Sequence, residues 1–466
     1  MSKSDQFLVS HLARRAGFGL TPAEISNYME MGYESLVEQF LSPSNPQHVD
    51  NDDLYRRFPE LHSALGPDAA IVWAYRMMKS GHPLEEKIAL FWHGVFATSN
   101  VKLNHPRALL DQIDMFRTFG MGRLDDLLIQ LSKNPAMIVW LDNQTNHKEA
   151  VNENYGREIL ELFSMGVGNY TEMDVKECAR AFTGWTIGNA DYMALMAQSD
   201  SIWPYSRIGW HYEYREEDHD TGEKTFLGEK GAFNGEDIIE IICCQQATAR
   251  FICRHLYNFF VADEVPVPQW GDIPPKDKLA IDTLTHAYLQ SDHDIRSVLR
   301  VLFNSDFFKE SEYERVKSPV ELVVGTLRTT GKFDSPESGL TVDTAIAEAG
   351  FMGQQLLHPP SVEGWHTGDE WITSGALIDR VNFVTKHLSD LNVQGVNQIT
   401  DSLDDEIGDI EYWDGIVNDC LETVGLISVS KDTRNLLVKS LRARMDGQRT
   451  PGLINTVGSS PEYQRC

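Results

Sequence analysis

The stretch NENYGREILELFSMGVGNYTEMDV, residues 152–175, carries the clearest periodicity in the chain. Wound at about 100° per residue, its first part has one polar wall and one apolar wall. The polar wall holds Glu153, Asn154, Arg157, Glu158 and Glu161, and the apolar wall holds Tyr155, Ile159, Leu160, Leu162 and Phe163. This division predicts a helix with one side in a protein core. Its other side faces either bulk water or a cleft.

The polar wall supports two interpretations. In the first it is a solvated or structural face, where Arg157 forms i,i+4 pairs with Glu153 and Glu161 that contribute about 0.2–0.5 kcal/mol each. In the second it lines a cleft, because asparagines alternate with carboxylates and one cation balances three anions. Grouped carboxylates repel one another, and a divalent metal, a nearby cation or a bound proton relieves that repulsion.

Composition sets the broad class. The 466 residues are 42% hydrophobic and 24% charged, as in ordinary globular proteins, and suffice for one large domain or two to three average ones. A formal net charge of −28 argues against binding to nucleic acid or anionic membranes, which needs clustered cations. So acidic a surface suits a basic protein partner or a saline habitat.

The cysteines and the N-terminus bear on the compartment. The six cysteines form no CxxC pair, and Cys243 and Cys244 lie in an apolar run, which predicts reduced thiols. The opening residues MSKSDQFLVSHLARRAGFG lack the apolar core of a signal peptide, and no window is long enough for a membrane span. The expected location is cytoplasmic for the sequence as written, or exported if a signal segment has been removed.

Helical signals dominate the chain. One helix is predicted to begin with Thr21 as its N-cap, Pro22 at the first helical position and Glu24 three residues after the cap. We therefore predict a mainly α, multi-helix globular domain over residues 1–390. Residues 391–466 are expected to form a C-terminal helical segment packed on the same domain.

One segment differs from this pattern. Residues 203–230 are rich in aromatic side chains that alternate with polar ones, which predicts a small β-hairpin insertion with Asp-Thr-Gly at 220–222 as its turn. Strands are expected in less than about 10% of the residues, against a usual share of about 20–25%.

Seven motifs occur in order along the chain: HLARRAGFG, KIALFWHGVFATS, NPAMIVWLDNQTN, the central stretch continued to ARAFTGW, HDTGEKTFLG, VKSPVELVVGTLR and GQQLLHPPSVEGW. Together they resemble the large bacterial family catalogued as domain of unknown function 1800. The resemblance covers about residues 8–385 and is expected to extend to the closing SSPEYQ. It implies no established reaction. Members often carry export signals, and this sequence departs from that pattern.

Two of these motifs contain candidate site residues of ambiguous role. Adjacent Arg14 and Arg15 point in different directions from a helix, so at most one is expected to enter a site. Arg14 is then either a bidentate clamp on a carboxylate or phosphate, or part of an ion pair that holds the N-terminal helix. His93 lies among aromatic residues and is either a ligand or base, or a satisfied core histidine.

Two loops are also candidates. His219 and Asp220 precede a turn and Lys224 follows it, in the kind of loop where chemistry concentrates; an Asp before Thr-Gly is equally an ordinary turn former. In HPPSVEGWHTGDEW, Trp365 and Trp371 suit a pocket rim that stacks on a sugar or another flat ligand face. Alternatively, the tryptophans only anchor a long loop to the core.

Several familiar signatures are missing. The sequence has no GxGxxG after a strand, no GxxxxGK[ST] loop, no HExxH and no GxSxG elbow. The central helix has ExxE at Glu158 and Glu161, where di-iron bundles require ExxH. Because these signatures are absent, the sequence motifs do not identify the reaction.

The favoured hypothesis is an enzyme for metal-assisted hydrolysis or group transfer on a small polar, oxygen-rich or carbohydrate-like substrate. The predicted catalytic groups are Glu158, Glu161, His93 and Asp220, and the predicted ligands of a divalent metal are Glu158, Glu161 and His219. The residues expected to contact substrate are Arg14, Asn154, Arg157, Lys224 and Trp365. The competing hypothesis is a non-catalytic binding or assembly protein, in which the polar residues form a buried structural charge network and the acidic surface docks a basic partner.

Overall fold

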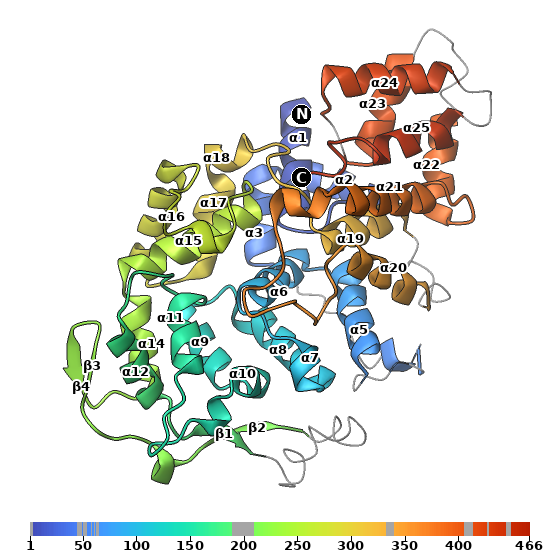
Figure 1. The fold of residues 1–466 in the computed structure, drawn as a ribbon. Helices are drawn as coiled ribbons and strands as arrows, with labels where there is room; N and C mark the ends of the chain where they lie inside the picture. Colours follow the sequence, from blue (N-terminus) through green and yellow to red (C-terminus); the bar gives the residue numbers. More distant parts are fainter. Residues whose placement is uncertain are drawn as a thin grey trace.

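The computed structural model describes residues 3–43, 49, 54–56, 58–59, 61, 65–188, 209–331, 340–404, 413–425, 428–443 and 449–466. In this part of the chain the protein is mainly helical, as predicted. Figure 1 shows the last helices, in orange and red, gathered at one end of the molecule and the short strands, in green, toward the opposite end. None of the described helices is long and apolar enough to cross a membrane.

The first helices follow the sequence signals closely. The second helix begins with the predicted capping box between Thr21 and Glu24, and it ends at Gly32. The helix Pro83–Val95 is buried along nearly its whole length, including its charged residues Glu86 and Lys87. The helices of this part are α1 (Lys3–Arg15), α2 (Pro22–Met31), α3 (Tyr33–Leu41), α5 (Gly66–Lys79), α6 (Pro83–Val95), α7 (Asn100–Leu103), α8 (Pro106–Phe119), α9 (Leu124–Ser132) and α10 (Pro135–Trp140), followed by the 3-10 helix η1 (Asn143–Thr145).

The central polar stretch forms α11 (Asn154–Glu161), which packs closely on α12 (Glu172–Ala181). Gly156 makes this approach possible, because a Cβ atom there would lie 2.9 Å from the backbone nitrogen of Ala179 and 3.0 Å from the carbonyl oxygen of Val175. The apolar wall of α11 is buried, as predicted: Ile159 and Leu160 are fully inaccessible. The packing against α12 therefore fixes which way the polar wall faces.

The strands differ in detail from the predicted hairpin. Two antiparallel pairs occur, β1 (Trp185–Gly188) with β2 (His211–Tyr214), and β3 (Lys224–Phe226) with β4 (Glu229–Gly231). Only the second pair is a hairpin within the predicted segment, and residues 227–228 form its turn instead of Asp-Thr-Gly. The first pair joins strands that are far apart in sequence. Residues 203–208 lie outside the described part of the chain.

The second half of the chain returns to helices. They are α14 (Gly235–Cys243), α15 (Gln246–Phe260), α16 (Lys278–Gln290), α17 (Ile295–Asn304), α18 (Asp306–Lys309), α19 (Pro319–Thr330), α20 (Leu340–Phe351), α21 (Ser374–Leu388), α22 (Gln394–Asp404), α23 (Trp413–Thr423), α24 (Lys431–Arg442) and α25 (Arg449–Gly458), with short 3-10 helices η3 (Glu216–Asp218), η4 (Val267–Gln269) and η6 (Gly368–Ile372). One hydrophobic cluster runs from Val9 in α1 to Tyr463 after α25. The cysteines are free thiols, and Cys244 alone among them is exposed.

A buried charge cluster ties distant parts of the chain together. The carboxylate of Glu321 in α19 accepts hydrogen bonds from Arg315 at 2.8 and 2.7 Å and from the ammonium group of Lys87 in α6. Lys87 also donates to the carbonyl oxygen of Gly17, at 2.8 Å. The three charged side chains are almost fully buried. This cluster joins the end of α1, the middle of α6 and the first turn of α19.

Candidate functional site

A cleft of about 520 Å³ opens beside α6. Leu90, Phe91 and Gly94 of α6 and Asn258 and Phe259 of α15 contribute to its wall. The remainder comes from three connecting segments, residues 263–269, 315–318 and 354–371. Rigid helices that carry loops around a concavity are a common design for ligand sites.

The Pro/Gly-rich loop forms one side of this cleft, and it is locked to α6 at one point. Gly364 has φ +88°, and a Cβ atom there would lie 2.2 Å from the carbonyl oxygen of Gly94. A larger residue at position 364 would therefore be both strained and in collision with the α6 backbone. Trp365 and Trp371 follow this contact, and both border the cleft. Trp371 is only 5% exposed, so the loop is also anchored to the core.

His93 lies next to the cleft, in the core. Its ring is fully buried between Trp73 and Trp365, with centroid distances of 5.4 and 5.2 Å. Burial, with a smaller effect from His358, lowers the pKa of His93 to about 3, so the imidazole is neutral. Neither ring nitrogen has a hydrogen-bond partner among the described residues. The placement corresponds to a core histidine under the loop, and His93 does not line the cleft.

Glu158 is the predicted residue whose environment is most unusual. Its carboxyl group is half-buried on α11, and burial together with repulsion from Glu161 and Glu363 raises its pKa to about 7, although Arg157 opposes this. Glu363 is exposed and borders the cleft. The loop thus places a further carboxylate within electrostatic range of Glu158. Glu161 itself accepts a hydrogen bond of 2.8 Å from the hydroxyl group of Tyr170.

The other polar residues of α11 are held by local bonds. Arg157 forms a bidentate pair with Glu172, at 2.9 and 2.7 Å, and a weaker contact of 3.7 Å with Glu153. The side-chain amide of Asn154 donates to the carbonyl oxygen of Leu141, at 3.0 Å. Both side chains act as ties between α11 and its neighbours. None of the predicted site residues on α11, Glu158 and Glu161 included, borders the cleft.

The turn at His219 and Asp220 forms a separate group at the end of α12. Asp220 accepts two hydrogen bonds from Arg180, at 2.7 and 3.1 Å, and this pairing lowers its pKa. The ammonium group of Lys224 donates to the carbonyl oxygen of Asp220 at 2.6 Å, and Nδ1 of His219 bonds with the carbonyl oxygen of Thr183 at 2.9 Å. Asp220 and His219 are held by residues 180 and 183, at and just after the end of α12, and Lys224 is held within the turn, which is the arrangement of a structural turn.

The predicted metal triad is therefore not assembled. Among the described residues, no group of three or more His, Cys, Asp or Glu side chains lies close enough together to hold a metal ion. Glu158, Glu161 and His219 are all described, and the sequence prediction that they converge is wrong on this point. The reason is topological, because His219 bonds to the segment after α12 while α11 presents its polar wall elsewhere.

Comparison with known proteins places the whole of this architecture in one family. A family model described as "Protein of unknown function (DUF1800)" matches residues 11–465. The chain belongs to that family. Comparisons with curated proteins and with solved structures return no match.

In this DUF1800 protein, sequence reasoning missed several cleft residues. Asp263 accepts a 2.8 Å hydrogen bond from the backbone nitrogen of Val316, and burial raises its pKa despite nearby Arg315. His255 borders the cleft, and burial lowers its pKa to about 3. His255 lies in the apolar helix α15, and Asp263 lies just after it. The sequence pattern there is that of a buried core helix, so it did not indicate that either residue borders a cleft. Glu363 lies inside a recognised motif, and its place beside α11 depends on the fold.

Proposed function

We propose that the cleft binds an oxygen-rich, carbohydrate-like ligand and that Glu158 acts there as a general acid–base in hydrolysis or group transfer. One observation carries the proposal: burial and repulsion from Glu161 and Glu363 raise the pKa of Glu158 to about 7, and Glu363 lines the cleft. A carboxyl group that exchanges its proton near neutral pH is suited to proton transfer, and such tuning commonly marks catalytic sites.

The wall of the cleft supports the ligand class. Half-buried Trp365 offers part of a flat apolar surface, and the side chains of Asn258, Gln354 and Glu370 offer hydrogen-bonding groups. Nε1 of Trp365 is buried and has no hydrogen-bond partner among the described residues. Aromatic faces combined with a few polar groups are typical of sites for sugars and similar molecules.

A divalent metal would be the other way to relieve the carboxylate repulsion around Glu158. Glu158, Glu161 and Glu363 influence one another electrostatically, but among the described residues no three His, Cys, Asp or Glu side chains lie close enough together to form a ligand group. Carboxylates alone suit a hard cation that keeps several waters, such as Mg²⁺. We favour proton uptake, because the raised pKa already accounts for the repulsion.

Binding is tested by the intrinsic fluorescence of the tryptophans during titration with soluble neutral oligosaccharides of several linkages. We expect a saturable change for at least one of them, strongly weakened in Trp365→Ala. Trp413→Ala is the matched control, because Trp413 lies on α23 and does not border the cleft. If no oligosaccharide changes the fluorescence, or both variants respond as the wild type does, the ligand class is wrong.

Catalysis is tested separately with the oligosaccharide that binds. Glu158→Gln should keep its affinity and lose turnover by a factor of about 10²–10⁴, which is the usual contribution of a general acid or base. Turnover should fall in the wild type as pH moves away from about 7 on at least one side. Equal turnover in Glu158→Gln and wild type would refute the assigned role even if the ligand is correct.

The second candidate is a non-catalytic binding or assembly protein. The buried cluster of Lys87, Arg315 and Glu321 supports it, since such clusters can specify a fold without any chemistry. It predicts that Glu158→Gln and Trp365→Ala leave all ligand responses unchanged. It also predicts salt-sensitive complexes with basic proteins, because the formal net charge is −28.

A further inference from the structure

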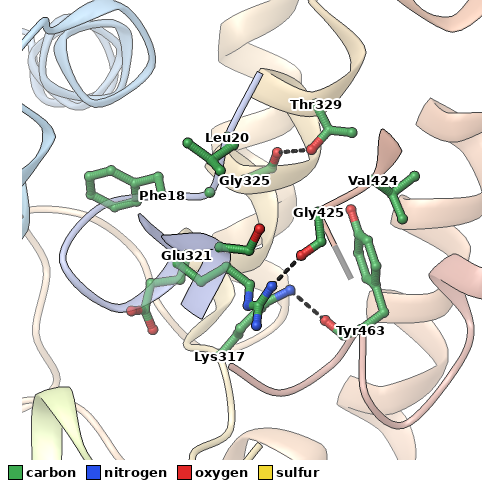
Figure 2. Close-up of a pocket in the computed structure, with 12 residues that line it drawn as sticks. Phe18, Leu20, Lys317, Glu321, Gly325, Thr329, Val424, Gly425 and Tyr463 are labelled. Atoms are coloured by element: carbon green, nitrogen blue, oxygen red, sulfur yellow. Dashed lines mark hydrogen bonds between the residues drawn. The ribbon is translucent and has the colours of Figure 1, made fainter. Parts of the chain in front are cut away.

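A second, smaller pocket lies apart from the cleft. It measures about 40 Å³ and is enclosed by the end of α1 and the turn after it, by α19, and by the chain near Gly425 and Tyr463. Figure 2 shows Lys317, Glu321 and Gly425 around it, with Tyr463 on one side and Phe18 and Leu20 on the other. A volume of this size holds roughly three water-sized centres, which is comparable to one compact tetrahedral anion.

Arg14 faces this pocket with unused donors. It is only 9% exposed, and Nη1 donates to the carbonyl oxygen of Gly425. Its Nε and Nη2 atoms are buried and have no hydrogen-bond partner among the described residues. Buried guanidinium donors without an acceptor are uncommon, because their lost hydration is not replaced. The unpaired Nε and Nη2 donors of Arg14 therefore indicate that an acceptor binds in the pocket.

Further cations surround the same space. The ammonium group of Lys317 donates to the carbonyl oxygen of Tyr463 at 2.6 Å and borders the pocket. Burial, with repulsion from Arg14 and Arg380, lowers the pKa of Lys317 to about 7, although attraction to Cys466 opposes this. Near neutral pH Lys317 is therefore charged in only part of the molecules, and an anion bound beside it would favour the charged form.

The nearby carboxylates differ: the oxygens of Glu321 are engaged, whereas the buried Oε1 atom of Glu312 has no hydrogen-bond partner among the described residues. Glu321 borders the pocket, but its oxygens accept from Lys87, Arg315 and the backbone nitrogen of Ser318. Glu312 attracts Arg14 and is hydrogen-bonded with Ser428 and Tyr313. The two carboxylates leave Nε and Nη2 of Arg14 without an acceptor.

We infer that this pocket binds a tetrahedral oxyanion, such as inorganic phosphate or the phosphate group of a larger molecule. Nε and Nη2 of Arg14 would donate to two of its oxygens, and Lys317 would supply a further positive charge. Guanidinium groups are well matched to two oxygens of a phosphate. This site is separate from the cleft and does not depend on the function proposed for it.

The direct test is isothermal titration calorimetry of the full chain with inorganic phosphate at constant ionic strength, beside chloride. We expect saturable binding of phosphate at one site and no saturable heat with chloride. A second titration with glycerol phosphate distinguishes the source: binding there means that the pocket accepts a phosphate group on a larger molecule, and its absence means a free anion. No saturable heat with either phosphate compound would overturn the inference.

Variants locate the site. Arg14→Gln and Lys317→Gln should each weaken phosphate binding by about tenfold or more, as expected for the loss of a charge-assisted hydrogen bond. Arg250→Gln is the matched control, because Arg250 pairs with Asp282 on the exposed surface and should bind phosphate as the wild type does. If Arg14→Gln does not fold, the phosphate affinity of Lys317→Gln alone tests the location of the site. Wild-type affinity in Lys317→Gln would place the anion elsewhere and refute the site.

Discussion

At the scale of single residues, Glu158 links stability to pH. Its pKa is raised to about 7 in the folded protein, so the folded state binds more protons than the unfolded state between about pH 4.5 and 7. Stability from this group is therefore lost as pH rises through that window. Glu158→Gln should stabilise the protein by about 1–2 kcal/mol at about pH 8, after allowance for solvent screening, and by little at about pH 5.

Urea unfolding at the two pH values measures this difference. The exposed Glu217→Gln variant is the control, and its free energy of unfolding should stay within about 0.5 kcal/mol of the wild type at both. A Glu158→Gln variant that is destabilised at the higher pH would show that the carboxylate is structurally bound in its charged form.

Residue roles were only partly predictable from sequence. The polar arc on α11 was visible, and so was the burial of its apolar wall. The main partner of Arg157 was not: it is Glu172 at the start of α12, whereas the sequence suggested Glu153, which lies 3.7 Å away, and Glu161. The repulsion from Glu363 was equally hidden, since that residue reaches α11 through a loop some two hundred positions later. Helical periodicity identifies neighbours within one helix and carries no information on contacts from elsewhere.

At the scale of elements, the position of α11 depends on its contact with α12. Gly156→Ala would place a Cβ atom 2.9 Å from the backbone nitrogen of Ala179 and 3.1 Å from its Cα, and backbone atoms cannot move aside cheaply. We expect a loss of about 1–3 kcal/mol in the free energy of unfolding, as for other overpacked sites. Gly375→Ala in α21 is the control, because a Cβ atom there meets nothing within 4 Å.

Chemical denaturation of both variants provides the measurement. The control should be neutral or slightly stabilised, since alanine favours a helix more than glycine does. A Gly156→Ala variant as stable as the control would mean that α11 and α12 can separate without cost, and the orientation of Glu158 would then not be fixed.

Elements with local signals were predicted well, and elements that depend on remote partners were not. The capping box of α2 was identified because its residues lie within four positions of one another. The pairing of β1 with β2 was missed because strands carry no local mark of a partner that lies beyond an intervening segment. The alternation of aromatic and polar residues within 203–230 correctly indicated strands, but it did not identify the strand with which β2 pairs.

At the scale of the whole molecule, the cluster around Glu321 should be critical for folding. Glu321→Gln would leave Lys87 and Arg315 buried without a carboxylate, which typically costs about 3–5 kcal/mol. Asp282→Asn breaks the exposed pair with Arg250 and should cost at most about 1 kcal/mol. Thermal unfolding of the two variants compares them directly. Similar melting temperatures would show that the buried cluster contributes no more than a surface pair.

The central claim is that the carboxyl group of Glu158, which is influenced by the cleft carboxylate Glu363, holds its proton near neutral pH. The most direct measurement is a pH titration of the side-chain carboxyl carbons by NMR in protein labelled at glutamate, with the Glu158→Gln variant to assign the signal. We predict that the Glu158 carbon titrates with a midpoint near 7. A midpoint near the ordinary glutamate value of about 4.3 would contradict the account, because Glu158 would then be a solvated carboxylate with no special role.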